Sequence, residues 1–168
     1  MSDLDRRQFI AVLGAVTAVR HLPLTGIGTG ASSIRVGYAA ITWGGKDEQA
    51  IDAILAATDP ASVGLLFDIA HYQQGGGDPV TAIGRHAKRI KAVHVKDVRP
   101  IAAAPGYQWV ELGRGRVDVK GCVAALKTAG YEGWAIVELD RVVDPDGTPK
   151  ASAAANRQYV ETQLGLTV

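Results

Sequence analysis

The stretch Arg89-Ile-Lys-Ala-Val-His-Val-Lys-Asp97 contains an apolar run, residues 90–95, that is typical of a buried β-strand. Strands buried on both faces of a sheet are almost continuously apolar and rich in β-branched residues. Similar runs occur on either side of it, at residues 63–67 and 134–138, and a further one precedes them at residues 34–41. Short apolar strands of this kind predict a parallel sheet that is covered by helices.

Helical patterns separate the four apolar runs. We predict helices over residues 47–57, about 78–88, 118–129 and about 151–164. Pro79 suits the first turn of the second helix, and Gly130 is a typical residue just beyond the end of the third. The alternation predicts an α/β fold with about four parallel strands and covering helices over residues 34–168, and polar groups that follow such strands gather at one edge of the sheet.

Length and composition exclude several classes of protein. The chain has 168 residues, whereas a complete eight-fold β/α barrel needs about 250. Its 18 basic and 17 acidic side chains give a net charge of +1, which provides no excess of positive charge to bind nucleic acid. The single cysteine, Cys122, excludes a disulfide framework and a cysteine-based zinc cluster, and we expect it to be buried within a helix and inert.

Three strand ends carry polar residues that a buried strand would not be expected to hold. Asp68 and Glu138 end their strands, and His94 interrupts a third. One imidazole and two carboxylates at one sheet edge could bind a divalent metal such as Mn²⁺, Mg²⁺, Co²⁺ or Zn²⁺. Taken singly, each carboxylate could instead cap a helix, and the histidine could be a hydrogen-bonded core residue. Three such residues, one on each strand, favour a site.

Three segments, residues 63–71, 89–97 and 131–140, resemble the sugar phosphate isomerase/epimerase family. This family belongs to the xylose isomerase-like barrel superfamily, and the segments resemble in particular its inosose dehydratase-like members. Residues 34–43 resemble the family's first strand, so the resemblance covers nearly everything after residue 33. It implies a (β/α)8-type barrel that uses one divalent metal, often manganese, to isomerise, epimerise or dehydrate a sugar or polyol.

The resemblance also implies roles for individual residues. Asp68, His94 and Glu138 match three of the family's four metal ligands, and His71 matches a substrate-binding histidine. Glu138 also matches one of two glutamates that move a proton between carbon atoms through an enediolate.

Two basic residues receive weaker assignments. Lys96 lies in a His-x-Lys-Asp motif, where it could contact a substrate oxygen in a catalytic or binding role, with a solvated loop lysine as the alternative. Arg99 is a further candidate for substrate binding.

Arg114 and Arg116 could bind an anionic substrate, although a tight turn is the preferred interpretation. Trp134 could stack on a sugar ring, but its place in a strand favours a core position.

About half of the expected barrel has no counterpart in the chain. The strand at residues 34–41 matches the first of the barrel, and those at 63, 90 and 134 match the sixth, seventh and eighth. These strands could form one sheet in the order six, seven, eight, one, and two copies could pair into an eight-stranded homodimer. The second of the family's two proton-transferring glutamates also has no counterpart in the chain. The alternative function is therefore a non-catalytic remnant that retains the fold and weak metal or sugar binding.

The first 33 residues are interpreted as a signal and linker. Arg6-Arg7 precede an apolar run, residues 9–19, in an arrangement that resembles a twin-arginine signal and predicts bacterial export to the periplasm. That run is too short for a stable membrane span. The alternative is an N-terminal helix of the domain itself. Residues 26–33 are interpreted as the linker that contains the cleavage site.

Overall fold

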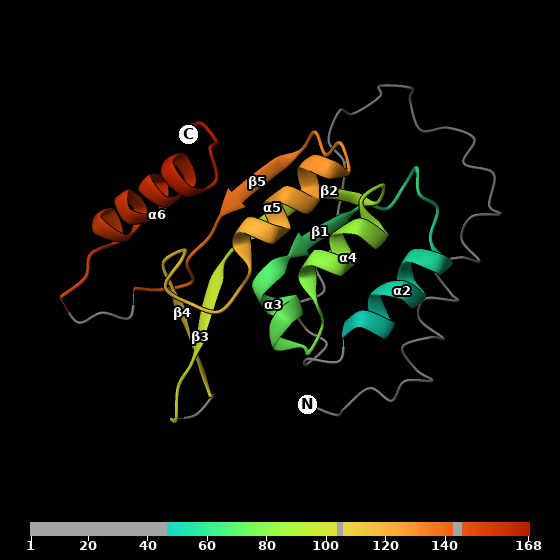
Figure 1. The fold of residues 1–168 in the computed structure, drawn as a ribbon. Coiled ribbons are helices and arrows are strands. Elements are labelled where there is room, and N and C mark those ends of the chain that lie inside the picture. Colours follow the sequence, from blue (N-terminus) through green and yellow to red (C-terminus); the bar gives the residue numbers. More distant parts are fainter. Residues whose placement is uncertain (1–46, 104–105, 143–145) are drawn as a thin grey trace, which may run out of the picture. The chain divides into compact units, whose positions relative to one another are not determined.

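The computed structural model describes residues 47–103, 106–142 and 146–168, which lie within one compact unit, Val36–Val168 (Figure 1). The predicted signal and linker, and the predicted strand at residues 34–41, lie outside the described residues. The elements are, in order, α2 (Asp47–Ala57), β1 (Leu65–Asp68), α3 (Ile69–Gln74), α4 (Pro79–His86), β2 (Ile90–Val95), β3 (Asp97–Pro100), β4 (Tyr107–Val110), α5 (Val119–Thr128), β5 (Trp134–Val137) and α6 (Pro149–Gln163).

The predicted parallel sheet is confirmed for three strands, in the order β1-β2-β5. Asp68 is in register with His94, and β5 follows β2 in register from Trp134 to Val137. The backbone N–H of Glu138 donates to the carbonyl of Val95 at 3.2 Å. This register brings the carboxyl ends of all three strands to one edge, and within the described residues they do not close a barrel.

Helices α4 and α5 pack side by side over one face of this sheet (Figure 1). The core beneath them is made of fully buried apolar side chains from strands and helices, among them Phe67, Ile83, Val93 and Val119. Helix α2 is tied to α4 through Asp52, whose carboxylate lies 3.2 Å from Nε2 of His86.

Side-chain caps define where the helices begin. Asp78 and Asp118, the first residues of two predicted helices, accept hydrogen bonds from backbone N–H groups in the first turns of α4 and α5. Beyond α5, Gly130 has a φ of +65°, a left-handed conformation that glycine adopts without a steric cost.

The antiparallel hairpin of β3 and β4 was not predicted. It follows β2 directly and extends from the carboxyl edge of the sheet (Figure 1). Asp97, at its base, is buried, and its carboxylate accepts hydrogen bonds from the backbone N–H groups of Val98, Gly113, Gly115 and Val117. This carboxylate fixes the loop after the hairpin against the end of β2.

The prediction that Trp134 lies in the core is wrong, because its side chain is 79% exposed. All four residues of β5 are exposed, including Ile136 and Val137. The strand pairs with β2 on one edge, and no described strand pairs with the other. The prediction that Cys122 is buried is confirmed.

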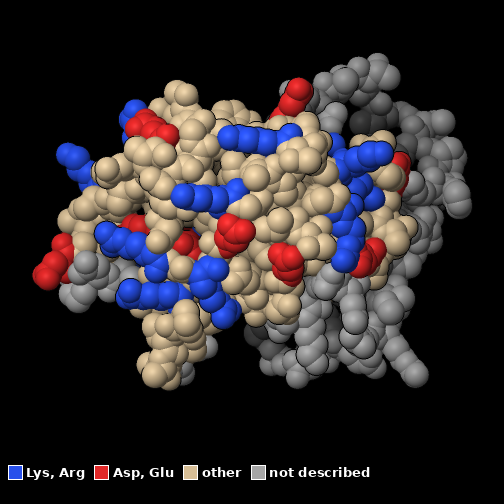
Figure 2. Space-filling view, in the orientation of Figure 1, with Lys and Arg blue, Asp and Glu red and all other residues tan. Residues whose placement is uncertain are grey.

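Acidic and basic side chains are interspersed over the face shown in Figure 2, in keeping with the net charge of +1. Among the described residues, no helix combines the length and the apolar character that a membrane crossing requires.

Candidate functional site

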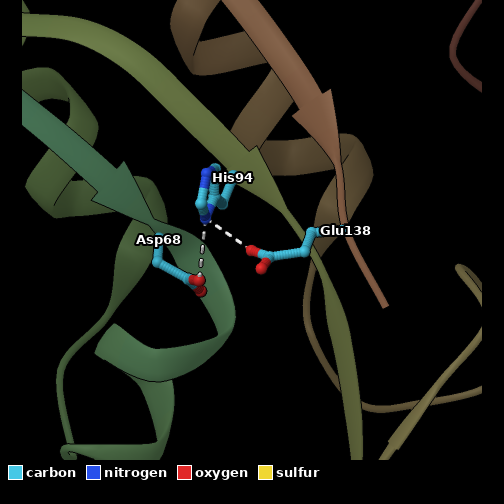
Figure 3. A group of neighbouring side chains, drawn as sticks. All are labelled: Asp68, His94 and Glu138. Carbon is cyan, nitrogen blue, oxygen red and sulfur yellow. Dashed lines mark ion pairs between the residues drawn. The ribbon is translucent and has the colours of Figure 1, made fainter. Parts of the chain in front are cut away.

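Asp68, His94 and Glu138 come together at the carboxyl edge of the sheet (Figure 3). One ligand atom from each residue lies within 4.8 Å of the others. Nδ1 of His94 lies between the two carboxylates, 3.6 Å from Oδ2 of Asp68 and 2.5 Å from Oε2 of Glu138. All three side chains are half-buried, so the group is close to solvent yet surrounded by protein.

The Asp68 carboxylate has two separate tasks. Its Oδ1 accepts hydrogen bonds from the backbone N–H groups of Ala70 and His71, at 3.1 and 2.9 Å, and thereby caps α3. Its Oδ2 faces His94. The helix-cap interpretation and the cluster interpretation of this residue are therefore compatible, because each uses a different oxygen.

Lys96 lies beneath the cluster, and the interpretation as a solvated lysine is wrong, since the residue is only 2% exposed. Residues i and i+2 of an extended strand point to the same side, which places Lys96 on the side of His94. Its Nζ is 2.9 Å from Oδ2 of Asp140, 3.2 Å from Oε2 of Glu138 and 3.5 Å from Oδ2 of Asp68.

Burial by itself would lower the pKa of Lys96. The hydrogen bond to Asp140, the negative charges of Asp68 and Asp140, and the adjacent Glu138 side chain outweigh that effect and raise the pKa above its ordinary value. Lys96 is therefore a charged ammonium at neutral pH.

Asp140 was not among the predicted site residues. It stands two residues after Glu138 and, like Glu138, directs its carboxylate at Lys96. The spacing Glu-x-Asp after a strand was the available signal, because alternate residues of extended chain share a side. Asp140 also lines a cavity of about 450 Å³ between the segment after β5 and α6.

His71, which the sequence resemblance assigns to substrate binding, lies next to the cluster. Its Nε2 is 4.0 Å from Oδ2 of Asp68 and 3.5 Å from Nζ of Lys96. The ring of Trp109, from the hairpin, meets the His71 ring edge-on, with 4.6 Å between the ring centres. Nζ of Lys96 lies 5.0 Å from the centre of the same Trp109 ring. The hairpin thus supplies an aromatic wall beside the cluster.

The remaining arginines are not part of the cluster. Arg99 is exposed on β3 and its guanidinium contacts Gln108. Arg114 pairs with Glu111, and Arg116 donates to Gln74. These contacts favour the tight-turn interpretation of the Arg114–Arg116 loop.

The donor set fits a divalent cation. Oε2 of Glu138 is buried and takes part in no hydrogen bond among the described residues, although it lies 2.5 Å from Nδ1 of His94 and 3.2 Å from Nζ of Lys96. In their ionised forms, the three carboxylates around Lys96 exceed its single positive charge by two negative charges. A divalent cation would balance that excess, and one nitrogen with two carboxylate oxygens is a common ligand set.

A parallel β/α sheet whose strand ends bring an imidazole and carboxylates to one edge defines a barrel-type α/β protein with a strand-end site. The model of one protein family, described as xylose isomerase-like TIM barrel, matches residues 30–162, and the chain belongs to this family. The predicted resemblance is thus confirmed.

Individual relatives agree with the family. An inosose dehydratase from Geobacillus thermodenitrificans (strain NG80-2) is 35% identical over 130 residues, covering 69% of this chain and 43% of the relative. A sugar phosphate isomerase/epimerase structure from Parabacteroides distasonis ATCC 8503 is 26% identical, with a TM-score of 0.56, and the match covers 68% of this chain and 36% of that one.

The structure of an IOLI protein with a binding zinc atom is 21% identical, with a TM-score of 0.56, over 70% of this chain and 43% of that chain. This likeness concerns the fold, and the zinc is that protein's own. The chain spans less than half the length of the curated relatives that it matches.

Proposed function

We propose that the chain binds a divalent cation through Asp68, His94 and Glu138 and acts there on a sugar or polyol. The observation that carries the proposal is the convergence of three ligand atoms within 4.8 Å at the carboxyl edge of the sheet. Similarity to proteins named inosose dehydratase and sugar phosphate isomerase/epimerase supports the substrate class. Manganese is the cation that we propose first, with magnesium, cobalt and zinc as alternatives.

The proposed reaction is isomerisation, epimerisation or dehydration that begins with removal of a proton from carbon beside a carbonyl. A bound divalent cation would supply positive charge to stabilise the resulting enediolate. The Glu138 carboxylate would accept and return the proton. His71, which is 37% exposed beside the cluster, would donate to a substrate hydroxyl, and Lys96 would contact a substrate oxygen that lies over the carboxylates. Arg99 would reach the substrate only from the outer hairpin.

The second candidate is a non-catalytic remnant of the family. Two observations favour it: the chain spans 43% of the inosose dehydratase to which it is 35% identical, and the second glutamate of the family pattern has no counterpart in the sequence. Such a protein would bind the cation or a sugar without exchanging protons.

Calorimetric titration with Mn²⁺ and solvent deuterium exchange into an inosose separate the two candidates. An active protein would bind Mn²⁺ and incorporate deuterium beside the carbonyl, and His94→Ala would abolish both signals because it removes a ligand. Lys91→Ala, exposed on the same strand, is the matched control and should retain both. Binding without exchange would establish the remnant, whereas failure to bind would refute the cation site.

Two further proposals come from the sequence. Residues 1–33 would act as a twin-arginine signal and linker that direct export to the bacterial periplasm; replacing Arg6 and Arg7 by lysine would then abolish export, detected by cell fractionation. Two copies of the chain would also pair edge to edge, through the two lateral edges of their predicted four-stranded sheets, to complete an eight-stranded assembly.

A further inference from the structure

The Lys96 ammonium has three carboxylates within reach but uses one of them in preference. Oδ1 of Asp140 accepts a hydrogen bond from Nζ at 3.1 Å, and Oδ2 of Asp140 lies at 2.9 Å. Glu138 and Asp68 are farther away, at 3.2 and 3.5 Å, and Oε2 of Glu138 has no hydrogen-bond partner among the described residues. Asp140 therefore holds the ammonium with both of its oxygens.

The other two carboxylates present to Lys96 the same oxygens that face His94. These atoms are Oδ2 of Asp68 and Oε2 of Glu138. An ammonium bound to them would occupy their lone pairs and repel a divalent cation at close range. The position of Lys96 thus determines whether both oxygens are available.

The Lys96 ammonium is enclosed by protein and does not reach solvent. Its side chain is 3% exposed, whereas that of Asp140 is 37% exposed, and the ring of Trp109 lies close to Nζ at 5.0 Å. An ammonium enclosed in this way needs a carboxylate partner. If Asp140 lost its charge, the remaining carboxylate partners would be Asp68 and Glu138.

We propose that Asp140 is a positioning residue: it binds the Lys96 ammonium and so keeps the facing oxygens of Asp68 and Glu138 free for a divalent cation. This inference rests on the proposed cation site. Asp140 itself does not contact the cation in this account and acts only through Lys96.

Titration of the full-length protein with Mn²⁺ tests the proposal. Asp140→Asn, which removes the charge but keeps the shape, should weaken Mn²⁺ binding about tenfold, the scale of outer-shell changes at metal sites. Lys96→Met removes the competing ammonium and should bind Mn²⁺ at least as tightly as the unmodified chain. Combining Lys96→Met with Asp140→Asn should restore binding to within about twofold of Lys96→Met alone.

That rescue is the readout that a merely structural role would not give, because structural losses would add in the double variant. A double variant as weak as Asp140→Asn would overturn the proposal, as would unchanged binding by Asp140→Asn. Circular dichroism verifies folding. If Lys96→Met does not fold, Asp140→Glu decides: it keeps the negative charge and should bind more tightly than Asp140→Asn, and equal affinities would refute the proposal.

Glu132→Gln, an exposed carboxylate-to-amide change before β5, is the matched control and should leave the affinity unchanged. Failure of the unmodified protein to bind Mn²⁺ would overturn the cation site and this inference with it. Binding by the unmodified protein without the predicted pattern among the variants would overturn the inference alone.

Discussion

Among single residues, Asp97 shows how one buried carboxylate can hold a loop in place. Its carboxylate accepts hydrogen bonds, at 2.8 to 3.0 Å, from four backbone N–H groups. One lies at the start of the hairpin and three lie in the loop that follows β4. Asp97 is adjacent to Lys96 in the chain, so the loop and the buried ammonium are anchored to the same end of β2. The hairpin residue Trp109 is held against Lys96 and His71 in consequence.

We expect Asp97→Asn to lower the free energy of unfolding by about 3 kcal/mol, because hydrogen bonds to a charged acceptor are lost and an amide NH₂ group faces backbone donors. Urea denaturation followed by circular dichroism measures the change. Glu132→Gln is the exposed control. A loss below about 0.5 kcal/mol would mean that the loop does not depend on this carboxylate.

The Cys122 thiol should be unreactive in the folded protein. Burial, and then the negative charges of Asp118 and Asp78, raise the pKa of Cys122 from 9.0 to about 12. Because the thiolate is the reactive form, a chromogenic disulfide reagent should react with it at neutral pH only after unfolding in urea.

The raised pKa of Cys122 also sets the sign of its contribution to stability. The folded protein holds the thiol proton more tightly than the unfolded chain does, so this contribution is fully present below pH 9 and is lost as the pH rises toward about 12. Rapid labelling of the folded protein at neutral pH would contradict the burial.

The residues of the cluster could be predicted because polar groups stand out in apolar strands. Asp68, His94 and Glu138 were chosen for that reason, and the structure brings them together. The partner of Lys96 could not be chosen in the same way, since Asp140 lies beyond its strand, where carboxylates are common. Its importance depends on the burial of Lys96, which only tertiary packing determines.

At the scale of elements, the helices whose ends carry their own signals were the most predictable. Asp118 begins α5 by accepting the backbone N–H of Gly121 at 2.8 Å, and Gly130 follows its end. The hairpin lacked such signals: its strands have four residues each, Pro100 ends the first, and its pairing joins residues across a loop. Helix α3 was not predicted, although a helix cap was one interpretation of Asp68, because its six residues are too few to show a helical period.

Asp118→Ala should lower the free energy of unfolding by about 1 kcal/mol, because the first turn of α5 loses its hydrogen-bonded cap. Asp118→Asn is the matched control, since asparagine caps helices about as well as aspartate does. Thermal and urea unfolding would measure both variants. Equal losses in the two would indicate that the charge, and not the cap, provides the stabilisation.

At the scale of the whole molecule, the exposure of β5 is the feature that needs explanation. Its side chains are apolar and exposed, with Trp134 79% exposed. No described strand pairs with the far edge of β5, and the predicted order of strands places residues 34–41 there. The sequence predicted the sheet but not this exposure, because burial of Trp134 depends on which neighbours are present and not on the pattern of the strand itself.

We therefore expect two copies to pair through the lateral edges of their predicted sheets, β1 and residues 34–41, and the protein to have the mass of a dimer in light scattering. Glu132→Lys, a change at an exposed residue before β5, should leave the dimer intact. A monomeric mass for the unmodified protein would contradict the proposed assembly.

The two oxygens of Asp68 couple the proposed binding of the cation to the binding of an organic ligand at His71. Since Oδ1 begins α3 and Oδ2 faces His94, a molecule that displaces α3 through His71 also displaces an oxygen proposed to bind the cation. Binding at one position then changes affinity at the other, and thermodynamic linkage makes the two changes equal in magnitude. A protein built in this way would sense the concentration of its cation through its affinity for the organic ligand.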